Sequence, residues 1–166
     1  MGLSLPLLDK VRYADEEEAQ KILEEYISTE RESSAEKVKN AIITLLKSPE
    51  RKVRRATLNA LRSTKFAEKD VVLSCAVMTK EDPEKSVRDL ASEVVLDLLK
   101  IEDEALKKDL VRGIVKLISK GKAMIDVTDV VKSIGVEFAK SMLEDPELDS
   151  ETKEYIQFAI EYLEKS

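Results

Sequence analysis

The sequence predicts an all-α protein, and three observations lead to this fold class. Apolar residues recur at three- and four-residue spacing from Ala14 almost to the end of the chain, which is the period of an amphipathic helix. The apolar/polar alternation of β-branched residues that marks strands is nowhere sustained. Apolar residues make up 43 % of the 166 residues, enough for a core at the size of one average domain. We therefore expect one domain over residues 1–166.

Short polar breaks divide the periodic stretches into eight expected helices. In chain order the breaks are Thr29 to Ser34, Ser48-Pro49, Ser63 to Lys65, Glu81-Asp82-Pro83, Ile101 to Asp103, Lys120 to Ile125 and Glu144 to Ser150. Their Ser, Asp, Pro and Gly residues are typical of helix ends. The helices between them span residues 15–28, 35–47, 50–64, 66–79, 84–100, 103–119, 127–143 and 150–164, with a short additional helix near 5–12.

Three breaks carry the same helix-start motif. It reads Ser48-Pro49-Glu50, Asp82-Pro83-Glu84 and Asp145-Pro146-Glu147. The Ser or Asp side-chain oxygen can accept a hydrogen bond from a backbone N–H of the first helical turn. Proline is favourable at the first helical position because the N–H that it lacks would have no partner there. The Glu carboxylate is stabilised by the positive end of the helix dipole. The first two motifs therefore predict helix starts with Ser48 and Asp82 as N-caps, and the third places the same cap signal before the last helix.

The first two motifs belong to an internal repeat. Their prolines are 34 residues apart, and Val53-Arg54 recurs at the same offset as Val87-Arg88. A third copy follows at an offset of 44, where Val131-Lys132 takes the place of Val87-Arg88 and Gly135 that of Ala91. Two helices in every 34 to 44 residues are typical of a helical solenoid.

At these positions the chain resembles the HEAT repeats. The segments SPERKVRRATLNAL and DPEKSVRDLASEVVLDLL are similar to the second helix of such a repeat, where an Asp-Pro start precedes a Val-Arg pair and a small residue. The resemblance covers about two-thirds of the chain and implies a right-handed α-solenoid. Its three helix pairs are 35–47/50–64, 66–79/84–100 and 103–119/127–143, and helices 15–28 and 150–164 cap the two ends. It also implies that the second helices line a concave surface to which partners bind.

The last expected helix is rich in aromatic residues. Three of the seven aromatic residues of the chain, Tyr155, Phe158 and Tyr162, lie within 150–164. Aromatic side chains bury the largest areas, so we expect them to cover the end of the core. The alternative is that part of this helix forms the seam of a homodimer.

Missing residue types exclude most enzyme chemistry. The chain has no His, which removes catalytic triads and imidazole metal sites, and Cys75 is its single cysteine. With only four glycines, no phosphate-binding glycine loop can be written. We expect no catalytic residues, no metal site and no cofactor, and we expect Cys75 to be buried in a reducing compartment.

A cationic face is the main candidate site. Residues 47–65 hold half of the eight arginines of the chain, and only Glu50 opposes them. On a helical wheel Arg51, Arg55, Arg62 and Lys65 lie opposite Val53, with Arg54 at their flank and Leu58 exposed among them. Arginine binds carboxylates or phosphates through two parallel hydrogen bonds. The six expected partner-binding residues are Arg51, Arg54, Arg55, Leu58, Arg62 and Lys65.

We therefore expect a non-catalytic interaction or assembly scaffold that binds an acidic protein surface. The alternative from the residues alone is that these arginines pair with acidic residues of adjoining helices. The alternative function is a nucleic-acid-associated protein that contacts phosphates through the same arginines, which an isoelectric point near 5.0 and the absence of Trp disfavour. A second basic stripe, Lys108, Arg112, Lys116 and Lys120, is expected on the other layer as an ordinary solvated face.

Composition and length also bear on location. No stretch reaches the roughly 18 apolar residues of a membrane span, and the leading leucines lack the basic flank of a secretory signal. We expect a cytoplasmic protein. The 20 Lys and 22 Glu against two Asn and two Gln are typical of thermophile proteins.

Overall fold

The computed structural model describes residues 5–165, which form ten α-helices and no strand. They are α1 (Leu5–Tyr13), α2 (Glu16–Glu30), α3 (Ala35–Leu46), α4 (Arg51–Thr64), α5 (Lys69–Glu81), α6 (Lys85–Leu98), α7 (Glu104–Ser119), α8 (Val127–Ile134), α9 (Val136–Leu143) and α10 (Ser150–Glu164). The prediction of an all-α fold is confirmed. Within the described range, no helix has the length and apolarity needed to cross a membrane.

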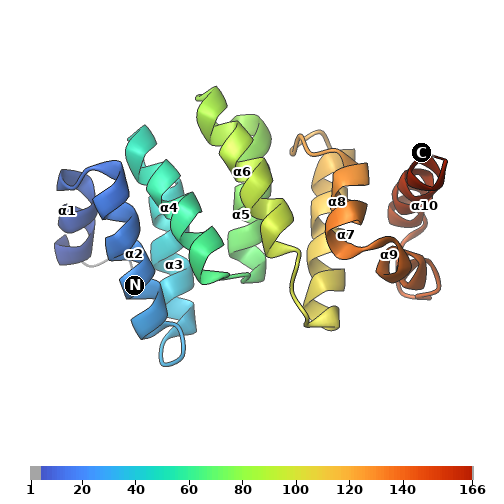
Figure 1. The fold of residues 1–166 in the computed structure, drawn as a ribbon, viewed down its shortest axis with the longest axis horizontal. Coiled ribbons are helices and arrows are strands. Elements are labelled where there is room, and N and C mark those ends of the chain that lie inside the picture. The colour runs from blue at the N-terminus through green and yellow to red at the C-terminus, as the bar shows by residue number, and fades with distance from the viewer. Residues whose placement is uncertain (1–4, 166) are drawn as a thin grey trace.

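The helices stand side by side in an elongated molecule, with α1 and α10 at opposite ends (Figure 1). In the view of Figure 1, α2, α4, α6 and α8 form a front layer, and α3, α5 and α7 lie behind them. Helix α4 packs between α2 and α6 in this layer and against α3 from the rear layer. One apolar core, with Leu23, Leu61 and Ile114 among its fully buried side chains, runs between the layers.

Several helices begin with an N-cap residue whose side chain accepts a backbone hydrogen bond. Asp15, Asp103 and Asp149 occupy N-caps and accept hydrogen bonds from backbone N–H groups three residues later, at 2.8 to 3.1 Å. Each carboxylate satisfies a donor that has no partner inside the helix and lies at the positive end of the helix dipole.

The proline motifs lie slightly outside the helices. The predicted N-caps Ser48 and Asp82 are two residues too early, because α4 and α6 begin after Glu50 and Glu84. Ser48 Oγ and Asp82 Oδ1 instead accept from the N–H groups of Glu50 and Glu84, at 3.2 and 2.9 Å. Asp145 makes the same bond to the Glu147 N–H at 2.9 Å, but the last helix begins only at Ser150.

The expected helix 127–143 is wrong, since it is two helices, α8 and α9, separated at Gly135. Gly135 has φ +91° and ψ 139°, a backbone conformation that residues with a Cβ rarely adopt. The glycine therefore ends α8 rather than serving as the small position of a continuous third repeat helix.

Candidate interaction surfaces

The structure divides the six predicted binding residues into exposed and buried groups. Arg51 and Lys65 are exposed, and Arg55 and Arg62 are partly exposed. The expected exposure of Leu58 is wrong, because its side chain is fully buried, and Arg54 is buried as well. Seven of the fourteen positions of α4 are buried, and at 100° per residue they span an arc of about 200°. The arc is wide because helices pack on both sides of α4 as well as behind it.

Arg54 forms a buried ion pair with Asp82, just before α6. Arg54 Nε lies 2.8 Å from Asp82 Oδ2, and Arg54 Nη2 lies 3.1 Å from Oδ1. The side chains are only 7 % and 3 % exposed. Arg54 Nη1 also donates to the carbonyl oxygen of Ser48 at 2.9 Å. The guanidinium is thus held at three points by its own chain and is not available as a surface contact.

Arg88 repeats one of these contacts in the next pair of helices. Its Nη1 donates to the carbonyl oxygen of Asp82 at 2.7 Å, as Arg54 donates to that of Ser48. Donor and acceptor are six residues apart in both cases, and the two bonds are 34 residues apart in the chain. The sequence repeat therefore corresponds to a repeated backbone contact.

Arg55 reaches both neighbours of α4 in the front layer. Its Nε lies 3.1 Å from Glu16 Oε2 on α2, and its Nη1 donates to the carbonyl oxygen of Ser86 on α6 at 3.3 Å. Arg51 Nη1 lies 3.4 Å from Glu84 Oε1. Arg51 and Arg55 each pair with a carboxylate of an adjoining helix or of its N-cap. This is the alternative stated above, in which the arginines of α4 pair within the chain.

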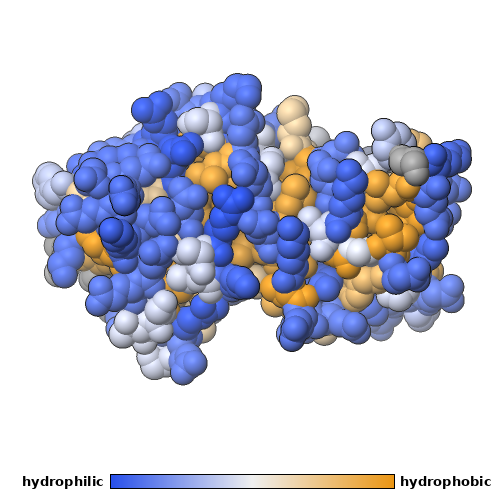
Figure 2. Space-filling view, viewed as in Figure 1, coloured by the Kyte–Doolittle hydropathy of each residue, from blue (hydrophilic) through white to orange (hydrophobic). Residues whose placement is uncertain are grey.

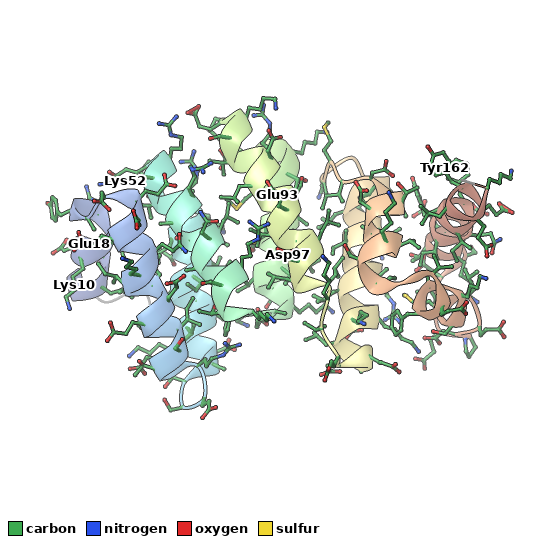
Figure 3. All side chains as sticks on the ribbon, viewed as in Figure 1. Lys10, Glu18, Lys52, Glu93, Asp97 and Tyr162 are labelled. Carbon is green, nitrogen blue, oxygen red and sulfur yellow. The ribbon has the colours of Figure 1, made fainter. Side chains whose placement is uncertain are left out.

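Arg62 contacts two carboxylates on α6. Its Nε lies 2.6 Å from Asp97 Oδ2, and its Nη2 lies 3.3 Å from Glu93 Oε1. Figure 3 shows Glu93 and Asp97 along α6. The hydrogen bond from Arg62 lowers the pKa of Asp97, and the bond to Asp97 raises the pKa of Arg62. Both shifts favour the charged forms, so the pair contributes to folding while Asp97 is ionised.

We expect acid to remove this contribution. Because the pKa of Asp97 is lowered from 3.8 in the folded state, the stabilisation is present above that value and is lost as the pH falls through the lowered pKa. Asp97→Asn should therefore be less stable than the wild type near neutral pH, and the difference should shrink as the pH falls to about 2.5. Urea denaturation across this range measures it.

Asp89→Asn is the control for this prediction, because Asp89 pairs with Lys85 on the exposed surface of the same helix. Asp89→Asn should change the free energy of unfolding only slightly at every pH. A difference between Asp97→Asn and the wild type that is constant across the range would contradict the predicted linkage.

Lys108, Arg112 and Lys116 of the second basic stripe lie on α7 in the rear layer (Figure 1), and Lys120 is the C-cap of this helix. Lys108 Nζ lies 3.4 Å from Asp145 Oδ2, and Arg112 Nη1 lies 3.6 Å from Asp109 Oδ1. The two basic stripes therefore lie on different layers, and both contain cations paired with carboxylates of the same chain.

The last helix presents aromatic residues outward. Phe158 is 69 % exposed and Tyr162 is 58 % exposed, whereas Ile156, Ala159 and Ile160 of the same helix are buried. The expectation that the aromatic residues of this helix cover the end of the core is therefore wrong for Phe158 and Tyr162, whereas Tyr155 packs half-buried against the core. At 100° per residue the three buried residues share one side of α10, which leaves Phe158 on the other side. Figure 3 shows Tyr162 at the α10 end of the molecule.

A shallow hollow of about 410 Å³ lies beside Phe158. We call this surface the end face. Its residues are Leu143, Lys153, Glu154, Gln157, Phe158 and Glu161. Figure 2 shows hydrophilic residues over most of the α2–α4 side of the visible surface, and apolar surface between α8 and α10 as well as in patches along α4 to α7.

The residues around the end face carry a net negative charge. Residues 136–165 carry nine carboxylates and three lysines, a difference of −6, which equals the formal net charge of the whole chain. The first 135 residues carry 25 acidic and 25 basic side chains, so they are neutral as a whole. The exposed apolar residues of α10 therefore lie within an acidic surrounding.

A second hollow, of about 570 Å³, lies between the proline motifs at Pro49 and Pro83. Leu46, Pro49, Met78 and Pro83 contribute its apolar lining, and the Arg54–Asp82 pair borders it. Because both charged groups bond within the chain, they offer no strong anchor to a ligand.

The described residues contain no group of three or more His, Cys, Asp or Glu side chains arranged to hold a metal ion. Cys75 is fully buried, and burial raises the pKa of its thiol to about 12. A protonated, inaccessible thiol is a poor nucleophile.

In comparisons with protein-family models, with curated proteins and with solved structures, nothing matches the chain.

Proposed function

We propose that the protein is a non-catalytic protein–protein interaction module with the architecture of a right-handed α-solenoid. Three consecutive pairs, α3/α4, α5/α6 and α7/α8, form its repeats, and α1/α2 and α9/α10 cap the two ends. Three observations support this arrangement: the packing within each pair, the packing between corresponding helices of adjacent pairs, and the matching bonds of Arg54 and Arg88. Each repeat contacts only its neighbours, so the ends must be closed by caps.

The exposure of Phe158 on the last helix is the observation that carries the proposed function. A terminal cap of a solenoid normally has a polar outer face. Here the cap exposes a large aromatic side chain beside Leu143 and a hollow. An exposed apolar patch with a polar rim is typical of a protein interaction site. We therefore assign partner binding to the end face.

The arginines of α4 are the weaker surface for a partner. An acidic protein or a nucleic acid would have to replace Glu16, Glu93 and Asp97, which already pair with Arg55 and Arg62. Arg51 and Lys65 are exposed, so binding of an acidic partner through them stays a prediction.

Affinity capture with matched variants tests the proposed function. The wild type should retain a stoichiometric protein partner from the native lysate with and without nuclease, and Phe158→Ser should lose it. Tyr13→Ser is the control, since Tyr13 is an aromatic residue exposed at the opposite end of the molecule, and it should retain the partner. Circular dichroism should show that both variants fold.

Capture that survives Phe158→Ser would refute the assignment to the end face. If Arg51→Glu together with Lys65→Glu abolished it instead, the acidic partner predicted from the sequence would be favoured. Loss of the complex on nuclease treatment would favour the nucleic-acid alternative.

A further inference from the structure

We propose that the partner element bound at the end face is a cationic amphipathic helix, which lies alongside α10. This inference rests on the proposed function and specifies its partner. Three features of the end face carry it: its position in the stack of helices, its apolar centre and its flanking carboxylates.

The position of α10 favours a helix as the bound element. The interior helix α4 packs between α2 and α6, whereas α10 packs against α7, α8 and α9, all of which precede it in the chain. Figure 1 shows α10 at the end of the molecule, with no further helix of the described residues beyond it. A helix laid against its outer side would continue the helix-on-helix packing that fills the rest of the structure.

The centre of the end face is apolar. Phe158 and Leu143 border the hollow of about 410 Å³. A leucine or another large apolar side chain of a partner can enter it and remove the exposed Phe158 ring from water. Partner helices commonly anchor through apolar residues at three- and four-residue spacing on one face.

The flanks of the end face are acidic. Glu154 and Glu161 are both exposed and line the hollow on either side of Phe158 in the sequence. Their seven-residue separation corresponds to about 10.5 Å along a helix at 1.5 Å per residue. Lysines or arginines two turns apart on a partner helix match this spacing. Lys153 is the single basic residue of the end face.

Charge disfavours a second copy of the chain as the occupant. A two-fold contact brings the same patch of both copies together. Packing α10 antiparallel against α10 about Phe158 would place Glu154 of one copy near Glu161 of the other, and like charges across an interface are unfavourable. A helix with apolar anchors and basic flanks complements both parts of the end face.

Designed peptides test the proposal directly. The probe is a fluorescent 18-residue helix with leucines at three- and four-residue spacing and lysines at the flanking positions. Its first control has the same composition in scrambled order, and its second has Glu in place of every Lys. Fluorescence anisotropy at moderate salt should show saturable binding of the Leu/Lys helix, about tenfold tighter than the scrambled peptide, and no binding of the Leu/Glu helix.

Variants of the protein place the binding on the end face. Phe158→Ser should weaken binding about tenfold or more, and so should Glu154→Lys with Glu161→Lys. Glu25→Lys with Glu32→Lys is the matched control, because these residues are exposed, seven positions apart and far from α10. It changes the net charge equally and should leave the affinity within about threefold.

Several results would overturn the proposal. Equal binding of the scrambled peptide, or equal weakening by both charge-reversal pairs, would show that only overall charge matters. A wild-type dimer that Phe158→Ser dissociates in sedimentation would make a second copy the occupant. If the lysate complex depends on Phe158 but no Leu/Lys binding occurs, this inference fails while the proposed function stands.

Discussion

Asp82→Ala is expected to lower the free energy of unfolding by about 3–5 kcal/mol, the range typical of breaking a buried ion pair by removing one partner. The substitution leaves the Arg54 guanidinium buried without its counter-charge, and the pair is almost completely shielded from water. It also removes the acceptor of the Glu84 N–H. Chemical denaturation monitored by circular dichroism measures the loss.

Two further variants make this prediction sharp. Arg51→Ala removes the exposed ion pair between Arg51 of α4 and Glu84, and it should change the free energy of unfolding by no more than about 0.5 kcal/mol. Replacing both Arg54 and Asp82 by Leu should lower the free energy of unfolding much less than the sum of the losses caused by replacing each residue alone, because no unpaired charge is then buried. A loss below about 1 kcal/mol in Asp82→Ala would show that water reaches the pair.

Leu58→Ala is expected to cost about 2–5 kcal/mol, which is the usual range for truncating a buried leucine. Leu58 is fully buried in the core. Had it been exposed on a binding surface, as the sequence predicts, the cost would be within about 0.5 kcal/mol. Met124→Ala is the control, since Met124 is a large apolar side chain that is 68 % exposed. An effect of Leu58→Ala as small as that of the control would contradict the structure.

The prediction for Leu58 also affects how binding experiments are interpreted. A variant at this position can lose a partner because a smaller fraction of the protein is folded. Stability must therefore be measured beside binding for any variant of α4.

Local signals explain which parts of the fold were predictable. The helices follow from apolar periodicity and from caps such as Asp15 and Asp149, which act over three or four residues. These interactions need no knowledge of the neighbouring helices. The end of α8 is also local, because Gly135 adopts a positive φ, but the apolar period continues through 127–143 and conceals the break.

Tertiary packing decides which residues of α4 are exposed and which are buried. A helical wheel divides a helix into one buried and one exposed side, but α4 has neighbours on two sides and behind it. That arrangement buries Leu58 and Arg54, although they lie near the arginine side of the wheel. The carboxylates of Glu16 and Asp97 lie more than 30 positions away from their arginines in the chain, so composition alone could not identify these pairs.

The exposure of Phe158 could have been found from the sequence. Ile156, Ala159 and Ile160 set the apolar phase of the last helix, and Phe158 lies out of that phase between Glu154 and Glu161. The high aromatic content favoured a core assignment, but the phase of these residues predicts the outward side.

The distribution of charge along the chain has a consequence for encounter with other molecules. Residues 5–34 carry a charge of −5, residues 35–135 carry +5 and residues 136–165 carry −6, so both ends of the elongated molecule are negative and its middle is positive. In the field of a cationic partner this distribution exerts a torque that turns one of the two ends toward the partner before any contact forms. The torque acts over about 10 Å at 0.1 M salt and over about 30 Å at 0.01 M, so ionic strength sets how early in the approach the molecule is oriented.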